Sequence, residues 1–149
     1  MKKTIFILTV ILFGTAAVYT QPATRKLTNG TKVIMTIGNE KIPATLNDST
    51  SAKALLERLP YTITLRRYSH DYCAVMSDPL PYDKADVHNG WLNGDIDFAT
   101  DGPYFTILFE DEERSKQYGN QVNIGVVDGD LSAIKKLGGS ITITIEASE

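Results

Sequence analysis

Polar and apolar residues alternate along several short segments of the chain, as they do in β-strands that bury one face. The alternation is sharpest in Tyr61–Arg67 and Ser140–Glu146, where every second residue is apolar. Two β-rich runs, Lys32–Ile37 and Lys41–Leu46, flank a Gly-Asn turn and predict a hairpin. Pro43 has no N–H to donate to a ladder, so we expect its strand at a sheet edge or at a bulge.

Other segments complete a mainly β pattern with two short helices. Ser51–Leu59 has apolar residues spaced three and four apart and is followed by Pro60, which predicts an amphipathic helix that ends there. About eight strands are expected, and no helices alternate with them, which excludes a parallel doubly wound sheet and favours a closed barrel or a sandwich. The remaining strand candidates are Asp71–Ser77, Asp95–Ala99, Tyr104–Phe109 and Ile124–Val127.

The segment Asn123–Leu137 has the most specific pattern in the chain. Its first residues predict a buried strand, Asp128-Gly129-Asp130 predicts a turn and a helix cap, and the apolar spacing that follows predicts a short helix. We expect Leu131, Ile134 and Leu137 to seat this helix on the core.

The N-terminus predicts export. A positive start, an apolar run and then small residues are typical of a secretory signal, which we place at residues 1–17 with a cleavage site that could extend to about 21. An uncleaved anchor helix is the alternative, because the apolar run can be extended to the lower limit for spanning a bilayer. Residues 18–30 are polar and aperiodic and predict a flexible tether, and residues 31–147 form the predicted domain. We expect a periplasmic or secreted protein without a membrane segment after cleavage.

Charge and cysteine content narrow the function classes further. The chain has 15 basic and 18 acidic residues, a net charge of −3 and no Lys/Arg-rich run, which argues against binding to nucleic acid or anionic membranes. Cys73 is the single cysteine, so the chain has no internal disulfide framework. Its apolar setting favours an inert buried thiol over a catalytic pair with His70. We expect a monomer.

The order of these segments resembles one known family. From about Lys32 to Glu146 the chain is similar to the bacterial cyclophilin-like domains, small proteins with the cyclophilin barrel and divergent sequences. The resemblance implies a closed eight-stranded β-barrel with two short capping helices. The matching segments are Lys32–Asn39, Leu55–Pro60, Thr62–Leu65, Asn93–Ile96, Phe105–Phe109, Ile124–Val127 and Ile141–Glu146.

The catalytic signature of true cyclophilins does not follow from this resemblance. That signature is Arg-x-x-Pro-x-Phe-x-x-Gln-Gly, and its residues catalyse isomerisation of the peptide bond before proline. The uncatalysed barrier to this isomerisation is about 18–20 kcal/mol. Here Arg66 and Arg67 are followed by Tyr-Ser-His-Asp-Tyr, and no catalytic residue can be carried over. A divergent prolyl isomerase therefore remains an alternative. A second alternative is an accessory role beside a flavodoxin-like redox partner, because related domains occur next to such proteins; we expect no cofactor in this chain.

The leading hypothesis is a module that binds a peptide or a small ligand through its loops. Asp78–Gly94 is long and punctuated by proline and glycine, and loops of this length in compact domains are often functional. Aromatic side chains in and near this loop suggest an aromatic-lined pocket. The alternative is that Trp91 simply covers the mouth of the barrel. The two histidines and nearby Asp86, Asp95 and Asp97 match no metal-ligand spacing, so no metal is predicted. The candidate binding residues are Tyr82, His88, Trp91, Tyr104 and Phe105.

Overall fold

The computed structural model describes residues 29–149. The predicted signal and nearly all of the predicted tether lie outside the described residues. Within residues 29–149, no helix is long and apolar enough to cross a membrane.

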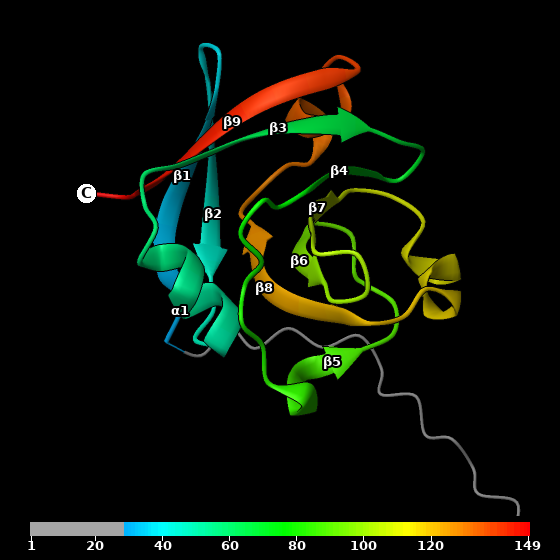
Figure 1. The fold of residues 1–149 in the computed structure, drawn as a ribbon. Helices are drawn as coiled ribbons and strands as arrows, with labels where there is room; N and C mark the ends of the chain where they lie inside the picture. The colour runs from blue at the N-terminus through cyan, green and yellow to red at the C-terminus, as the bar shows by residue number, and fades with distance from the viewer. Residues whose placement is uncertain (1–28) are drawn as a thin grey trace, which may run out of the picture.

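Eight antiparallel strands close into a barrel, as the resemblance implied, and the alternative of a sandwich is excluded (Figure 1). The ring order is β2-β1-β9-β3-β4-β7-β6-β8, and pairing of β2 with β8 closes it. A ninth strand of two residues, β5, adds to the far side of β8. The strands are β1 (Thr31–Ile37), β2 (Glu40–Leu46), β3 (Tyr61–Arg67), β4 (Asp71–Val75), β5 (Val87–His88), β6 (Asp95–Ala99), β7 (Tyr104–Leu108), β8 (Gln121–Val127) and β9 (Ser140–Ala147).

The expectation for Pro43 was wrong, because β2 is not an edge strand and pairs on both sides. The β2–β8 ladder begins one residue later, at Ala44 opposite Val127, so the missing N–H of Pro43 breaks no bond of that ladder. The carbonyl of Pro43 still accepts a hydrogen bond from the backbone N–H of Asp128 at 2.9 Å. Proline is therefore tolerated next to the first residue pair of the β2–β8 ladder, the seam that closes the ring.

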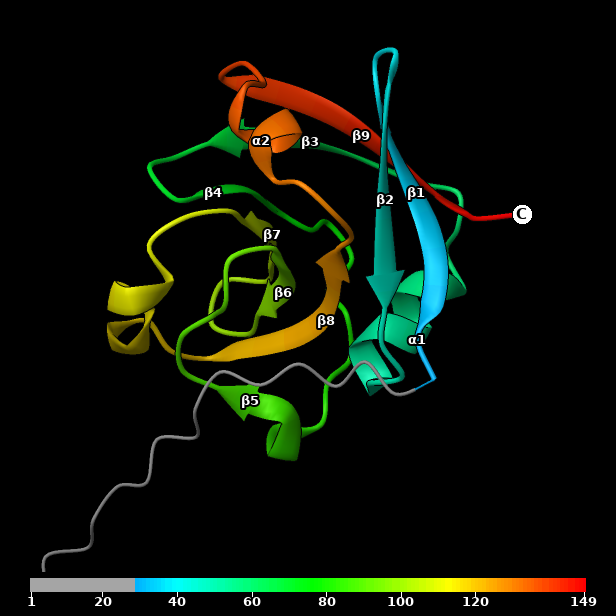
Figure 2. The ribbon, with the colours of Figure 1, turned by 180° about the vertical axis from the view of Figure 1, so that it is seen from behind.

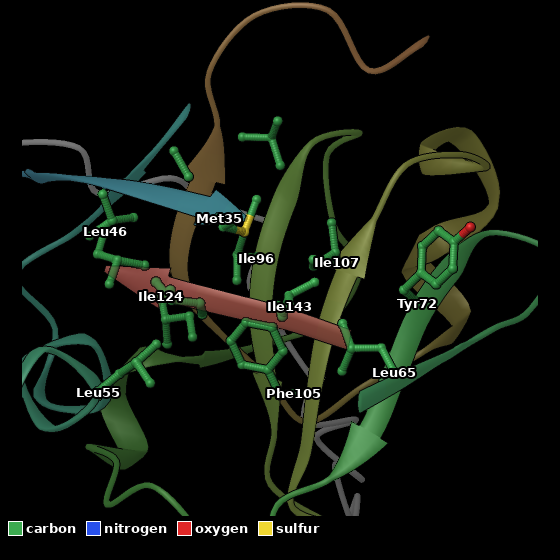
Figure 3. Close-up of a cluster of buried hydrophobic side chains, with 14 of the residues drawn as sticks. Met35, Leu46, Leu55, Leu65, Tyr72, Ile96, Phe105, Ile107, Ile124 and Ile143 are labelled. Carbon is green, nitrogen blue, oxygen red and sulfur yellow. The ribbon is translucent and has the colours of Figure 1, made fainter. Parts of the chain in front are cut away.

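The barrel interior is filled by side chains from every strand of the ring (Figure 3). Leu65, Phe105, Ile124 and Ile143 are fully buried there, and each belongs to a different strand. Alternate residues on each strand point inward, so their neighbours point outward. The interior is therefore a packed core, and any ligand site of this barrel has to lie on its outer surface or at its ends.

One short helix precedes β3 in the chain, and a second lies beside the far end of that strand. Helix α1 (Thr50–Leu56) starts at the N-cap Ser49, whose hydroxyl accepts from the backbone N–H of Ala52, and it ends three residues earlier than the spacing predicted. Helix α2 (Ser132–Lys135) lies at the other end, as Figure 2 shows. There the Arg67 guanidinium donates to the carbonyl of Lys135 at 3.0 Å, which ties β3 to α2.

The long loop before β6 runs over the outside of the barrel. It contains a 3₁₀ helix, η1 (Lys84–Asp86), and then β5, which lies beside β8 in both views (Figures 1 and 2). The connection from β7 to β8 contains a second 3₁₀ helix, η2 (Glu112–Gln117). These two connections form walls above the outer faces of β4, β7, β6 and β8.

Candidate ligand-binding site

A pocket of about 380 Å³ opens on the outer face of the barrel. Its floor follows from strand alternation: Phe105 and Ile107 of β7 point into the core, so Tyr104, Thr106 and Leu108 face outward into the pocket. The neighbouring strands add outward-facing residues in the same way. These are Asp71 and Cys73 from β4, Ala99 from β6 and Gln121 from β8.

Three aromatic rings form one wall of this pocket. The rings of His70, Trp91 and Tyr118 lie against one another, with centroids 4.9 Å apart for His70–Trp91, 5.3 Å for Trp91–Tyr118 and 5.4 Å for His70–Tyr118. Separations of this size are typical of favourable aromatic pairs. Trp91 is 2% exposed, and Tyr118 is 44% exposed, so the tyrosine presents most of the free ring surface.

Hydrogen bonds to the β7–β8 connection hold Trp91 in place. Its indole N–H donates to the carbonyl of Glu110 at 2.9 Å, and its backbone N–H donates to the Ser115 hydroxyl at 3.0 Å. That hydroxyl lies 2.7 Å from the carbonyl of Glu112 and 3.1 Å from that of Trp91. The wall is thus rigidly fixed by bonds between two connections that are distant in sequence.

Buried polar groups support the loop beneath the wall. The carboxylate of Asp95 accepts a hydrogen bond from the backbone N–H of Leu92 at 2.7 Å, in the turn before β6. The Asn123 amide donates to the carboxylate of Asp97 at 2.9 Å, and Asn47 donates to the Asn123 carbonyl at 2.7 Å. These bonds satisfy groups that would otherwise be costly to bury, and they fix β6 against β8.

Cys73 and Asp71 lie side by side on the outer face of β4. Burial, together with the smaller effects of the negative charge and hydrogen bond of Asp71, raises the pKa of the Cys73 thiol to about 12. Burial also raises the pKa of Asp71, against a smaller lowering by His70. The thiol is therefore protonated at neutral pH, which agrees with the predicted inert thiol, although Cys73 is only half-buried.

We expect slow alkylation of Cys73 by iodoacetamide at pH 8, because a thiol of pKa about 12 is ionised in roughly one molecule in 10⁴ at that pH. The substitution Asp71→Asn removes two of the three causes that raise the thiol pKa, so alkylation should become faster. Glu40→Gln, which removes an equal charge from the distant β1–β2 hairpin, should leave the rate unchanged. Mass spectrometry of timed samples measures the rates, and equal rates in all three proteins would contradict the proposed coupling.

The structure brings two of the five predicted binding residues together in this pocket, Trp91 and Tyr104. His88 is buried in β5 beside Gln121, and its Nε2 has no hydrogen-bond partner among the described residues. Phe105 lies in the core, on the opposite face of β7 from Tyr104. Tyr82 approaches the core residue Phe98, with ring centroids 6.4 Å apart, and does not line the pocket.

Sequence reasoning missed several lining residues. The sequence assigned no binding role to Tyr118 or Gln121, and nothing in their spacing links them to Trp91. His70 was considered as a catalytic partner of Cys73 and as a metal ligand, but not as a wall of a ligand pocket. In the structure His70 and Cys73 both line the pocket, and Nδ1 of His70 lies 3.7 Å from the Asp111 carboxylate. The described residues contain no group of three His, Cys, Asp or Glu placed to hold a metal ion.

Two further hollows adjoin the pocket and share lining residues with it. One, of about 430 Å³, lies over β3 and β4 and shares Cys73 and Tyr104 with the pocket. The other, of about 310 Å³, lies against η2 and shares His70, Gln117 and Tyr118. We call this continuous surface the outer groove.

Arginine side chains occupy different positions relative to the outer groove. Arg66 lines the hollow over β3 and β4, whereas Arg67 lies over the rings of Phe109 and Tyr72, with its guanidinium carbon 4.7 and 5.4 Å from their centroids. Arg67 also donates to the Tyr72 hydroxyl at 3.0 Å. These contacts give Arg67 a structural role at the α2 end of the barrel.

The closed antiparallel ring, its solid core and its helix at each end define a β-barrel of the cyclophilin type with a candidate ligand site on its outer wall. The chain belongs to the Cyclophilin-like family, whose sequence pattern matches residues 35–146. No curated protein gives a significant match to the sequence.

A solved structure shows the same fold. The solution structure of a hypothetical protein from Archaeoglobus fulgidus is similar with a TM-score of 0.65 and 11% sequence identity. The similarity covers 83% of this chain and 98% of the archaeal chain. At this identity the similarity supports the barrel alone.

Proposed function

We propose that this protein is an exported peptide-binding module that holds an extended peptide in its outer groove. The observation that carries the proposal is the gathering of exposed aromatic and apolar side chains there. Six large hydrophobic side chains are exposed among the described residues, and four of them line the groove. These four are Tyr68, Val75, Tyr104 and Tyr118. Contiguous apolar surface of this kind commonly marks interaction sites.

The shape of the outer groove favours a peptide over a compact ligand. The central pocket of about 380 Å³ suits one or two side chains, and the hollows of about 430 and 310 Å³ adjoin it through two different sets of lining residues. An extended peptide places successive side chains about 3.3 Å apart along its axis. It can therefore fill the pocket and both hollows at once, which a compact ligand cannot.

Export is part of this proposal and is supported by the N-terminal sequence. The positive start, apolar run and small residues of residues 1–17 support a secretory signal. An exported groove-binding module would meet peptides or chain segments of other exported proteins.

Selection from a library of random peptides displayed on phage tests the proposal. We expect enriched peptides that bind the purified protein in calorimetric titrations and change the fluorescence of Trp91, the single tryptophan of the sequence. Tyr118→Ala should weaken their binding by about tenfold, because it removes an exposed aromatic contact. Lys53→Ala, which truncates an exposed side chain on α1, is the matched control and should bind normally.

Two outcomes would overturn the proposal. One is a selection without enrichment over uncoated beads. The other is equal affinity of the selected peptides for the wild type and for Tyr118→Ala, which would place their binding outside the outer groove.

A divergent prolyl isomerase is the second candidate, and the position of Arg66 favours it. Arg66 lies in a hollow with Val75 and Tyr104, so a guanidinium stands next to apolar surface. A guanidinium can polarise an amide without titrating. A protease-coupled assay on an X-Pro peptide decides this question, since a rate equal to the uncatalysed rate removes the candidate, and catalysis that is lost in Arg66→Ala supports it.

A further inference from the structure

We propose that the central pocket binds the cationic end of a lysine or arginine side chain of the bound peptide. This inference rests on the proposed function and adds the chemistry of the group that the pocket selects. Three independent features of the pocket carry it: its charge, its ring surfaces and a buried acceptor without a partner.

The charge of the pocket is negative. Asp71 lies on its floor and Asp101 on its rim, and among the described residues that line it none is Lys or Arg. Asp101 is exposed and is engaged by Asn120, whose amide donates to the carboxylate at 3.3 Å. Asp71 is buried without a lysine or arginine in the lining, and His70 only partly offsets the desolvation that raises its pKa, so a ligand cation would offset it further.

Aromatic surfaces of the pocket suit a cation as well. Tyr104 and Tyr118 are 40% and 44% exposed, and both line the pocket. Tyr104 comes from β7, and Tyr118 comes from the β7–β8 connection. A guanidinium or ammonium within about 6 Å of such a ring is attracted by its π face. Arg67 shows this preference within the same molecule, where it packs on the rings of Phe109 and Tyr72.

Gln121 supplies the third feature. Its side chain lines the pocket and is only 7% exposed, yet its Oε1 has no hydrogen-bond partner among the described residues. A buried acceptor without a donor costs roughly 1–3 kcal/mol. Rotation about the terminal torsion of the side chain, which is broad for glutamine, can turn this oxygen towards a donor in the pocket. Lysine and arginine ends carry donors only, three and five respectively.

A matched pair of small probes tests the inference without relying on the peptide selection. N-acetylarginine amide and N-acetylcitrulline amide have nearly the same shape, and only the first is charged. We expect the arginine probe to shift the amide NMR signals of pocket residues and to bind about tenfold more tightly than the citrulline probe, because charge-assisted bonds are the stronger ones. Asp101→Asn should reduce this difference, whereas Glu40→Gln should preserve it.

The outcomes separate this inference from the proposed function. Equal affinity for the two probes, or absence of pocket shifts with either, overturns cation recognition. Selected peptides without a basic residue also overturn it but leave peptide binding intact. Conversely, specific binding of the arginine probe together with a failed peptide selection supports the cation site and removes the peptide-binding module.

Discussion

Gly125→Ala should destabilise the barrel by about 3 kcal/mol, since it overpacks the β2–β8 seam that closes the ring. A Cβ at this position would lie 2.5 Å from the Thr45 carbonyl oxygen, 2.9 Å from a methyl carbon of Leu46 and 3.1 Å from its Cα. Two of these three atoms are backbone, so the strain cannot be relieved by a side-chain rotation. Urea unfolding followed by circular dichroism measures the loss, which is large against the 5–15 kcal/mol typical of whole domains.

Gly138→Ala is the matched control, because a Cβ there would meet nothing within 4 Å. Its free energy of unfolding should stay within about 1 kcal/mol of the wild type. An unfolding midpoint of Gly125→Ala equal to that of the wild type would show that β2 and β8 do not approach each other as closely as the register requires.

The barrel could be predicted because its strands carry strong local signals. Tyr61–Arg67 and the hairpin of β1 and β2 match the observed strands within one residue at each end, since alternation and turn residues act over short distances. The place of Pro43 could not be predicted, because its tolerance depends on where the β2–β8 ladder starts. Ring closure joins segments about 80 residues apart in sequence, and no local pattern encodes that pairing.

The candidate site was only partly predictable for the same reason. Trp91 stood out as the one tryptophan in a long loop, and Tyr104 as an aromatic at a strand start. The partners of Trp91 come from the β7–β8 connection and the β3–β4 turn, so the stacking with His70 and Tyr118 required the tertiary structure. The sequence placed Phe105 beside Tyr104, but only the register of β7 shows which of the two faces outward.

Tyr104 and Phe105 should therefore respond to alanine substitution in opposite ways. Phe105 is completely buried in the core, so Phe105→Ala should cost about 3–5 kcal/mol of unfolding free energy. Tyr104 is 40% exposed and lines the outer groove, so Tyr104→Ala should change stability by only about 0.5 kcal/mol. Urea unfolding measures both effects, and calorimetry with the selected peptides should show weaker binding by Tyr104→Ala.

Substitutions at these two neighbouring residues distinguish a role in core packing from a role in ligand recognition. Phe105→Leu keeps most of the buried apolar volume, so it should recover much of the stability lost in the alanine variant and bind the selected peptides with wild-type affinity. If Phe105→Leu is stable but loses peptide binding, Phe105 acts in recognition and the inward register of β7 is wrong. If Tyr104→Ala unfolds as readily as Phe105→Ala, the outer groove is part of the barrel core and offers no free surface to a ligand.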